Sequence, residues 1–228
     1  MQLSIAIHSC SKDASITLAI EGQPTHHIQL DPQSRTAATI TPALDSLLEQ
    51  VRTSGQPLDY IAVTDGPGSF TGLRIGVTTA KTLGYALGIK IVAVDSLAAM
   101  AFHLWAKQPD ATAAMVAINA YRGQVFAATW TREQWATALD SGEFATQSRV
   151  VLAAQWLSEV AAADPAVAIG AETVIANRSG YERVLPVEPN ASEVAMLGHL
   201  IAAKHLFVSP MQLLPRYLRD SAAEEKLL

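Results

Sequence analysis

The feature that most restricts the fold of this chain is a glycine-rich segment, DGPGSFTGLRIG, at residues 65–76. An apolar run, YIAV, precedes it and predicts a buried strand, while residues 69–88 have the apolar spacing of a helix. The segment therefore places Gly66, Gly68, Gly72 and Gly76 where a strand gives way to a helix. Glycines at such a connection either surround a phosphate group or allow the helix to pack closely on its neighbours.

Three named motifs with glycine at such a connection do not match this segment. A Walker A loop continues with a lysine after its last glycine, whereas Gly72 is followed by Leu73. A dinucleotide fingerprint needs a third glycine where Thr71 stands. A nucleophile elbow around Ser69 needs glycines in place of Pro67 and Thr71. A general anion site stays open, because every helix N-terminus presents amides and the positive end of the helix dipole.

The two faces of the helix at residues 69–88 differ in composition. One face is apolar and is expected to be buried: Leu73, Val77, Ala80, Leu83 and Leu87. Small residues recur every four positions across this face, which favours close packing on the helix's own sheet: Gly72, Gly76, Ala80 and Gly84. The opposite face has no acid and holds Thr71, Arg74, Thr78, Lys81, Thr82 and Tyr85, flanked by Ile75. This composition indicates a protein interface, and a merely threonine-rich exposed helix is the alternative.

The order of elements in the first half predicts a ribonuclease-H-like lobe over residues 1–108. Strands are expected at residues 3–7, 15–20 and 25–30, and their short connections favour antiparallel pairing. A helix follows, with an apolar stripe at Ile40, Leu44, Leu47, Leu48 and Val51. It begins either with Thr41 as the cap and Pro42 as its first residue, or near Arg35 with a kink at Pro42. Strands at 59–64 and 89–94 alternate with helices at 69–88 and 96–107, the latter capped by Ser96.

A second, smaller lobe is expected over residues 109–228. Strands are predicted at 113–120 and 124–130, joined by a turn at Tyr121, Arg122 and Gly123. A helix at 152–163 and a strand at 166–170 follow, while residues 131–150 fit no single pattern. A final helix at 190–206, capped by Asn190, is expected to pack back on the first lobe. The fold class is therefore α/β, with two lobes that each hold a mixed sheet flanked by helices.

Composition narrows the classes of function. The chain of 228 residues has 16 Lys and Arg against 21 Asp and Glu and shows no basic patch, which disfavours tight nucleic-acid binding by its own surface. Its one cysteine, Cys10, fits a reducing cytoplasm. We expect no signal peptide and no membrane span, because no apolar run is long enough. The six histidines form no metal-binding pattern, and we expect Cys10 to be a turn residue with no base nearby rather than a nucleophile.

Several strings resemble one known family. The string GPGSFTGLRIGVTTAKTLGYALGIKIVAVDSLAAMA is similar to the signature region of the TsaB family, also called YeaZ. INAYRGQVFAATW and LLPRYLRDSAAEEK resemble two later regions of the same family, so the resemblance covers most of the chain and is weakest over residues 131–189. It implies the ASKHA fold, which consists of two ribonuclease-H-like halves.

The resemblance also implies a function and partners. TsaB is a degenerate relative of TsaD and pairs with it through the first two helices of its N-terminal half. TsaD carries the metal and transfers the threonylcarbamoyl group to adenosine 37 of tRNA, and the ATPase TsaE joins the complex. This chain is accordingly expected to have no catalytic residue, cofactor or metal of its own, to meet tRNA only through the complex, and to be able to form a homodimer when TsaD is absent.

This sequence departs from the family at positions that bear on catalysis. His8 stands where the family has an acid after the first strand, and Asn119 stands where it often has Asp. The segment from Thr36 to Thr39 replaces a histidine-containing string. Imidazole is a poor substitute for carboxylate towards Mg²⁺, so these changes weaken the two alternative functions, an active phosphotransferase of this fold and a peptidase-like protein.

Overall fold

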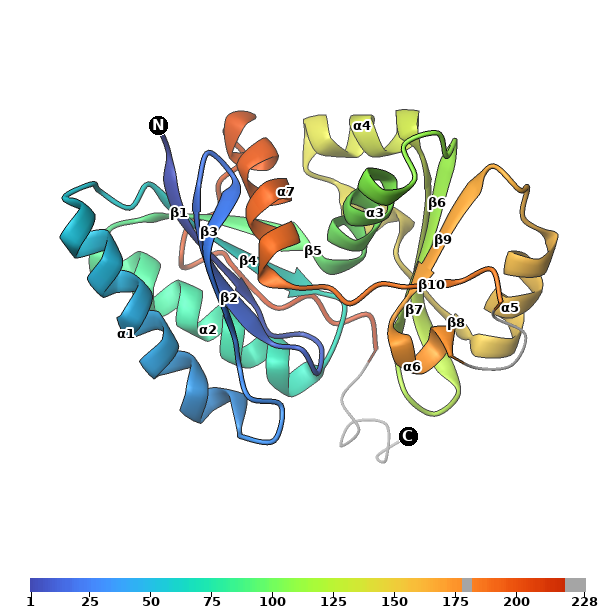
Figure 1. Ribbon diagram of the computed structural model, residues 1–228, viewed down its shortest axis with the longest axis horizontal. Coiled ribbons are helices and arrows are strands. Elements are labelled where there is room, and N and C mark those ends of the chain that lie inside the picture. The colour runs from blue at the N-terminus through green and yellow to red at the C-terminus, as the bar shows by residue number, and fades with distance from the viewer. Residues whose placement is uncertain (178–181, 220–228) are drawn as a thin grey trace.

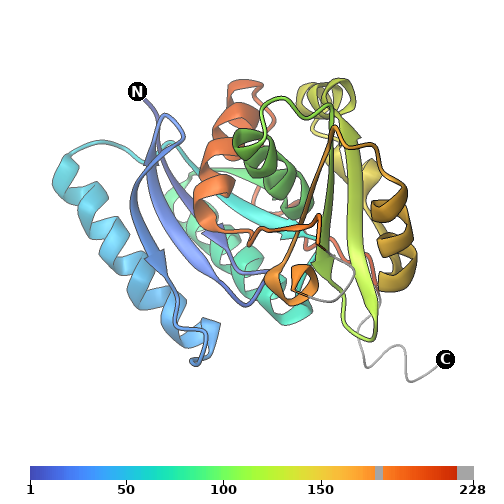
Figure 2. The same ribbon diagram turned by 45° about the vertical axis from the view of Figure 1, so that its right-hand side comes forward.

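The computed structural model describes residues 1–177 and 182–219, which form two five-stranded sheets with helices on their faces (Figures 1 and 2). The strand order is β3-β2-β1-β4-β5 in the first sheet and β10-β9-β6-β7-β8 in the second. This arrangement confirms the predicted α/β class with two lobes, each holding a mixed sheet.

The first sheet begins with three antiparallel strands, as the short connections predicted. These are β1 (Leu3–His8), β2 (Ser15–Ile20) and β3 (Gln23–Gln29). The strands β4 (Tyr60–Gly66) and β5 (Lys90–Asp95) then join β1 in parallel. Successive side chains of β1 point to opposite faces, so Ile5 and Ala6 enter two different apolar clusters and both faces of the sheet are covered.

Helices from both halves of the chain cover this sheet. The helices α1 (Thr36–Ser54) and α2 (Phe70–Leu87) pack on the face of Ile5. The helices α3 (Ser96–Lys107) and α7 (Ala191–Ala203) pack on the other face, and α7 contacts β1 and β2 (Figure 1). Asn190 caps α7, with its side chain accepting from the amide of Ser192. The helix α7, from the second half of the sequence, thus lies on the first sheet.

The second sheet contains β6 (Ala113–Asn119), β7 (Gln124–Thr131), β8 (Arg149–Leu152), β9 (Val167–Ala171) and β10 (Leu185–Pro186). The pair β6–β7 is antiparallel, and β9 runs parallel to β6. The helices α5 (Ala153–Ala162) and α6 (Thr173–Ala176) follow β8 and β9. The segment without a clear pattern contains α4 (Arg132–Ser141) and the 3-10 helix η1 (Phe144–Gln147). A capping box between Thr131 and Gln134 starts α4.

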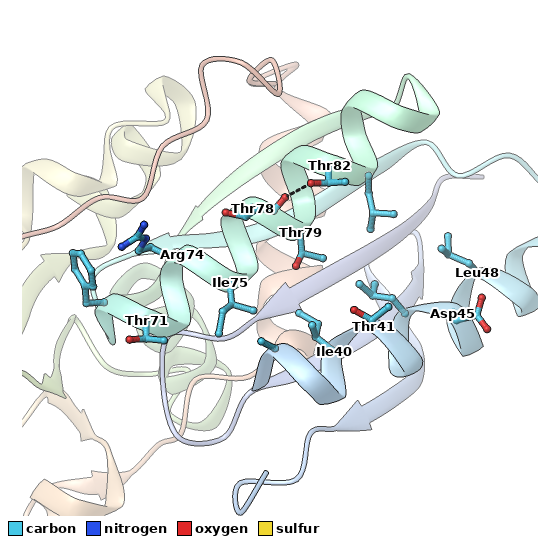
Figure 3. Close-up of a pocket in the computed structure, with 14 residues that line it drawn as sticks. Ile40, Thr41, Asp45, Leu48, Thr71, Arg74, Ile75, Thr78, Thr79 and Thr82 are labelled. Atoms are coloured by element: carbon cyan, nitrogen blue, oxygen red, sulfur yellow. Dashed lines mark hydrogen bonds between the residues drawn. The ribbon is translucent and has the colours of Figure 1, made fainter. Parts of the chain in front are cut away.

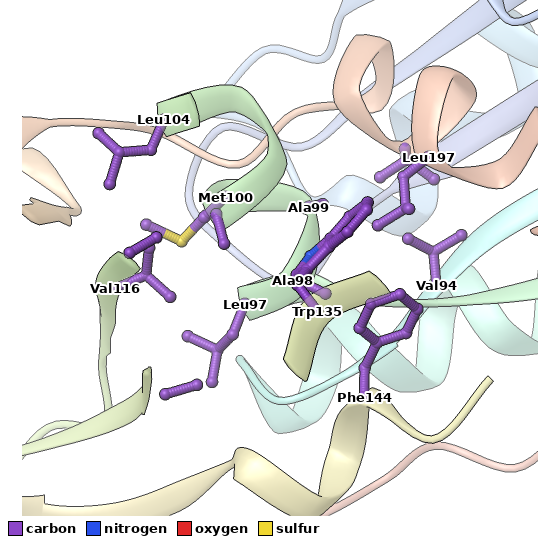
Figure 4. Packing of buried hydrophobic residues seen from close by; sticks show 14 of the residues in the cluster. Val94, Leu97, Ala98, Ala99, Met100, Leu104, Val116, Trp135, Phe144 and Leu197 are labelled. Atoms are coloured by element: carbon purple, nitrogen blue, oxygen red, sulfur yellow. The ribbon is translucent and has the colours of Figure 1, made fainter. Parts of the chain in front are cut away.

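One apolar cluster joins the two lobes. Figure 4 shows Leu97 and Met100 of α3 beside Val116 of the second sheet, with Leu197 of α7 and Val94 of the first sheet on the other side. Because α3 contacts both sheets, it ties the lobes together through buried apolar surface. In the part of the chain that the structure describes, no helix has the length and apolar character needed to cross a bilayer.

The structure decides one open alternative and corrects two local predictions. The helix α1 begins at Thr36 and contains Pro42, so the start near Arg35 was the better of the two alternatives. Asp95, and not Ser96, caps α3 by accepting from the amide of Ala98, because the hydroxyl of Ser96 donates to the carbonyl of Pro67. The side chain of Leu87, predicted to be buried, is 51% exposed because it lies in the last turn of α2.

Candidate functional site

The glycine-rich segment forms the connection between β4 and α2, and its polar groups are bonded within the protein. Ser69 caps α2, with its Oγ 3.3 Å from the amide of Gly72. The amide of Ser69 donates to the carbonyl of Cys10 at 2.7 Å, and the amide of Leu73 donates to the carbonyl of Ser69. Three amides at this end of the helix therefore already have protein acceptors, which leaves fewer donors for a phosphate.

The glycines of α2 face inward and bring the helix close to its own sheet. A Cβ atom at Gly72 would lie 1.8 Å from the carbonyl oxygen of Ser9, and one at Gly76 would lie 2.2 Å from the Oγ of Ser9. The hydroxyl of Ser9 donates to the carbonyl of Gly72 at 2.8 Å. A Cβ at Gly84 would lie 2.8 Å from the Cδ1 of Ile91 in β5. These glycines leave room for the strands beneath the helix.

The outer surface of α2 forms one wall of a groove whose other wall is α1 (Figure 3). The groove has a volume of about 710 Å³. Five of the residues predicted for a protein interface line it: Thr71, Arg74, Ile75, Thr78 and Thr82. The other two lie outside it, and Tyr85 is 77% exposed whereas Lys81 is half-buried.

Residues of α1 complete the groove, and sequence reasoning assigned none of them individually. They are Ala37, Ile40, Thr41, Leu44, Asp45 and Leu48. Figure 3 shows Ile40, Thr41 and Leu48 on α1, across the groove from Ile75 and Thr79 on α2. The sequence shows an apolar stripe on α1 that includes Leu48. It does not show that the side chain of Leu48, at the edge of this stripe, stays partly exposed in the folded protein.

The chemistry of the groove suits packing and not bond cleavage. Its two ionisable side chains, Asp45 and Arg74, lie towards opposite ends (Figure 3). The guanidinium of Arg74 lies over the ring of Phe70, 5.4 Å from its centroid. Apolar side chains with threonine hydroxyls between them can receive a helix or loop of another protein.

A second cavity, of about 580 Å³, lies between the two lobes and is lined by acids. Burial raises the pKa of Glu172 to about 7, and its Oε2 accepts from the amide of Asn119 at 2.8 Å. Glu188 and Asp13 line the same cavity, with Lys12 as a cation. Among residues 1–177 and 182–219, no group of three or more His, Cys, Asp or Glu side chains is placed to hold a metal ion.

His8 and Cys10 lie side by side near this cavity, contrary to the expectation that Cys10 has no base nearby. The Sγ of Cys10 lies 3.8 Å from the Nδ1 of His8, and the Nε2 of His8 lies 2.8 Å from the Oγ of Ser11. Burial lowers the pKa of His8 to about 3 and raises the pKa of Cys10 to about 12. Both groups are therefore neutral at pH 7, so the pair is not an activated thiolate.

The C-terminal segment is anchored beneath the glycine-rich loop by a buried ion cluster. The Nη2 of Arg216 lies 2.5 Å from the Oδ2 of Asp95 and 3.5 Å from the Oδ1 of Asp65. The amide of Arg216 donates to the carbonyl of Asp65 at 2.7 Å, and a Cβ at Gly66 would lie 2.4 Å from the carbonyl oxygen of Arg216. Burial raises the pKa of Asp65 to about 7. Sequence reasoning identified neither this cluster nor its role in holding the loop.

The sequence and the fold of this chain are similar to those of several known proteins. Residues 33–227 match the sequence model of a family described as TsaD: tRNA N6-adenosine threonylcarbamoyltransferase. The chain is 28% identical over 234 residues to the tRNA threonylcarbamoyladenosine biosynthesis protein TsaB of Escherichia coli (strain K12), covering 98% of this chain and 97% of that one. It is 34% identical over 196 residues to TsaB of Bacillus subtilis (strain 168), covering 81% and 80%. The solved structure of YeaZ from Pseudomonas aeruginosa shares the fold, with a TM-score of 0.67, 23% identity and coverage of 96% and 100%.

Proposed function

This chain belongs to the TsaB (YeaZ) family, and from that premise we propose that it is a non-catalytic subunit that pairs with TsaD for threonylcarbamoylation of adenosine 37 in tRNA. Its relatives are tRNA threonylcarbamoyladenosine biosynthesis proteins, which places its role in that pathway. The observation that carries the finer proposal is the apolar groove between α1 and α2, because the two helices leave partly exposed apolar side chains between them.

The groove supports pairing with a protein more than binding of a small molecule. Apolar side chains and threonines of α1 and α2 line it, and its charged side chains, Asp45 and Arg74, lie towards its ends (Figure 3). The interface in this proposal comprises Thr71, Arg74, Ile75, Thr78, Lys81, Thr82 and Tyr85 of α2, together with the facing side chains of α1. Lys81 and Tyr85 lie beyond the groove and would contact the periphery of the partner.

The cavity between the lobes supports the absence of catalysis by this chain. A phosphotransferase of this fold would need a metal-binding acid where the neutral imidazole of His8 is buried. The acids Asp13 and Glu188 line the cavity and would repel a polyphosphate. ATP and metal are accordingly assigned to the partner subunits, TsaD in direct contact and TsaE in the same complex, and tRNA meets this chain only within that complex.

Substitution of Thr78 by glutamate tests the proposal. Thr78 is exposed at the groove, so a carboxylate there would leave the fold intact but would lose its hydration when a partner covers it. We expect Thr78→Glu to weaken pairing with TsaD by roughly 3 kcal/mol or more, which is over a hundredfold in Kd. Analytical ultracentrifugation with TsaD measures the pairing, and circular dichroism verifies the fold.

Thr137→Glu provides the matched control, because Thr137 is exposed on α4 of the other lobe. This variant should pair with TsaD as the wild type does. Ultracentrifugation of the chain alone tests the homodimer, which Thr78→Glu should also dissociate if the same groove forms it. A folded Thr78→Glu protein that binds TsaD with wild-type affinity would refute the interface.

A further inference from the structure

The groove between α1 and α2 has charges of opposite sign towards its two ends. Among the described residues that line it, Asp45 of α1 and Arg74 of α2 are the ionisable ones. Figure 3 shows them far apart, with apolar side chains and threonines between them. An apolar surface alone accepts many partners, whereas charges at fixed places discriminate between partners of different charge.

Arg74 carries a charge that no acid in the described part of the chain neutralises. Its side chain is exposed, and none of the described carboxylates lies within ion-pair distance of it. Its guanidinium lies over the ring of Phe70, 5.4 Å from the centroid. A contact with a ring face attracts the cation but leaves its charge in place. The positive charge at this end of the groove therefore remains for a partner to neutralise.

The ring beneath Arg74 is itself held in place. Phe70 is the first residue of α2, and its ring stacks on that of Tyr217, with centroids 4.5 Å apart and an angle of 27° between their planes. Tyr217 follows Arg216, which the buried carboxylate of Asp95 anchors. Arg74 is thus the last of three stacked planar groups. A side chain held in this way loses less rotamer entropy when it pairs, which suits it to bind an acid.

Asp45 provides the opposite charge at the other end of the groove. Its side chain is 80% exposed, and its Oδ1 lies 3.9 Å from the Nη2 of Arg52. That guanidinium donates two hydrogen bonds to Glu49 and none to Asp45. Glu49 therefore takes up most of the charge of Arg52. A partner that covers the groove removes water from both of its ends, and each end then costs free energy unless the partner supplies the opposite charge.

We propose that the groove selects a segment of TsaD that places an acidic side chain against Arg74 and a basic side chain against Asp45. The two charges then fix the direction in which the segment lies, because the reversed direction brings like charges together at both ends. Phe70 is the positioning residue for Arg74. The inference rests on the proposed pairing with TsaD, and adds to it the pattern of charge that the partner must present.

Titration of full-length TsaD with the full-length chain tests this pattern, with analytical ultracentrifugation at about 50 mM and about 500 mM salt. Arg74→Gln and Asp45→Asn should each weaken pairing at least about fivefold at the lower salt. Each loss should shrink at the higher salt, because screening removes the attraction that the variants already lack. In the double variant the two losses should multiply, because the charges lie towards opposite ends of the groove and meet different partner groups.

A double-mutant cycle tests the role of Phe70. Phe70→Leu keeps an apolar side chain at the groove but removes the ring beneath Arg74. It should weaken pairing about threefold when Arg74 is present and much less in the Arg74→Gln background. An equal loss in both backgrounds would refute the positioning role, because Phe70 would then contribute apolar contact alone.

Lys107→Gln and Asp110→Asn are the matched controls, because both residues are exposed at the C-terminal end of α3, which packs on the other face of the first sheet. Their affinity for TsaD should stay within about twofold of the wild type. Circular dichroism verifies that each variant is folded. The inference is wrong if Arg74→Gln and Asp45→Asn pair as tightly as the controls, or if their losses are equal at both salt concentrations. Thr78→Glu separates the two proposals: if it abolishes pairing while the charge variants pair normally, this inference alone fails.

Discussion

Replacement of Arg216 by methionine should remove a cation that the carboxylates of Asp65 and Asp95 share. The side chain of Asp95 is 4% exposed and that of Asp65 is 20% exposed, and both face the same Nη2 of Arg216. The pKa of each acid is raised by burial and lowered again by Arg216. Without the guanidinium, two acids would face each other in a poorly hydrated site, and the C-terminal segment would lose its anchor beneath the glycine-rich loop.

The magnitude of this loss follows from the burial of the cluster. Breaking a buried ion pair by removal of one partner costs roughly 3–5 kcal/mol. Arg216 is 22% exposed, so water reaches part of the site and the lower end of that range applies. The hydrogen bond from its Nη2 to the carbonyl of Gly66 adds about 1 kcal/mol. We therefore expect Arg216→Met to lower the free energy of unfolding by about 3–4 kcal/mol at pH 8.

Urea unfolding followed by circular dichroism measures the loss, and its pH dependence tests the cause. With slopes of a few kcal/mol per molar urea, the midpoint should fall by roughly 1 M at pH 8. Protonation neutralises both acids, so the deficit should shrink as pH falls from 8 towards 5. Asp95→Asn added to Arg216→Met should restore part of the loss, because asparagine can still accept from the amide of Ala98.

Arg52→Met is the control for the loss of an arginine side chain. Arg52 is exposed and paired with Glu49, so its removal should leave the midpoint of urea unfolding nearly unchanged. A deficit for Arg216→Met that is below about 1 kcal/mol at pH 8, or that is equal at pH 8 and pH 5, would show that the cluster does not hold the loop through charge.

Two further predictions concern the cavity between the lobes and the packing of α2. Burial raises the pKa of Glu172 from 4.5 to about 7, so the folded state favours the protonated acid and the wild type loses stability as pH rises between those values. The glutamine of the Glu172→Gln variant cannot ionise, so the Tm of this variant should exceed that of the wild type by roughly 5 °C at pH 8 but not at pH 4.5. A variant Tm at or below the wild-type Tm at pH 8 would contradict this. Gly72→Ala should lower the free energy of unfolding by about 2 kcal/mol or more, despite a gain in helix propensity of about 1 kcal/mol, because the new Cβ meets the backbone of Ser9. Gly76→Ala should cost less, since it meets only the rotatable hydroxyl of Ser9, and equal losses in urea unfolding would refute that distinction.

The sequence by itself determined the order and pairing of most elements, because the signals for these are local. Strand periodicity and short connections predicted the antiparallel start of the first sheet, and the Tyr121 turn predicted the β6–β7 hairpin. The spacing of small residues on α2 indicated which face packs on the sheet. Residues 131–150 were not predictable in this way, since a capping box, a 3-10 turn and a short strand follow one another without a sustained period.

Only the tertiary structure decided how distant segments meet. An apolar stripe shows that a side of α1 is buried, but not that its edge joins the outer side of α2 in one groove. Nothing local places Arg216 against Asp65 and Asp95, which are far earlier in the chain. The physical reason is that hydrophobic burial is non-directional. The spacing of apolar residues in the sequence therefore indicates which side chains become buried, whereas the fold of the whole chain determines which side chains they contact.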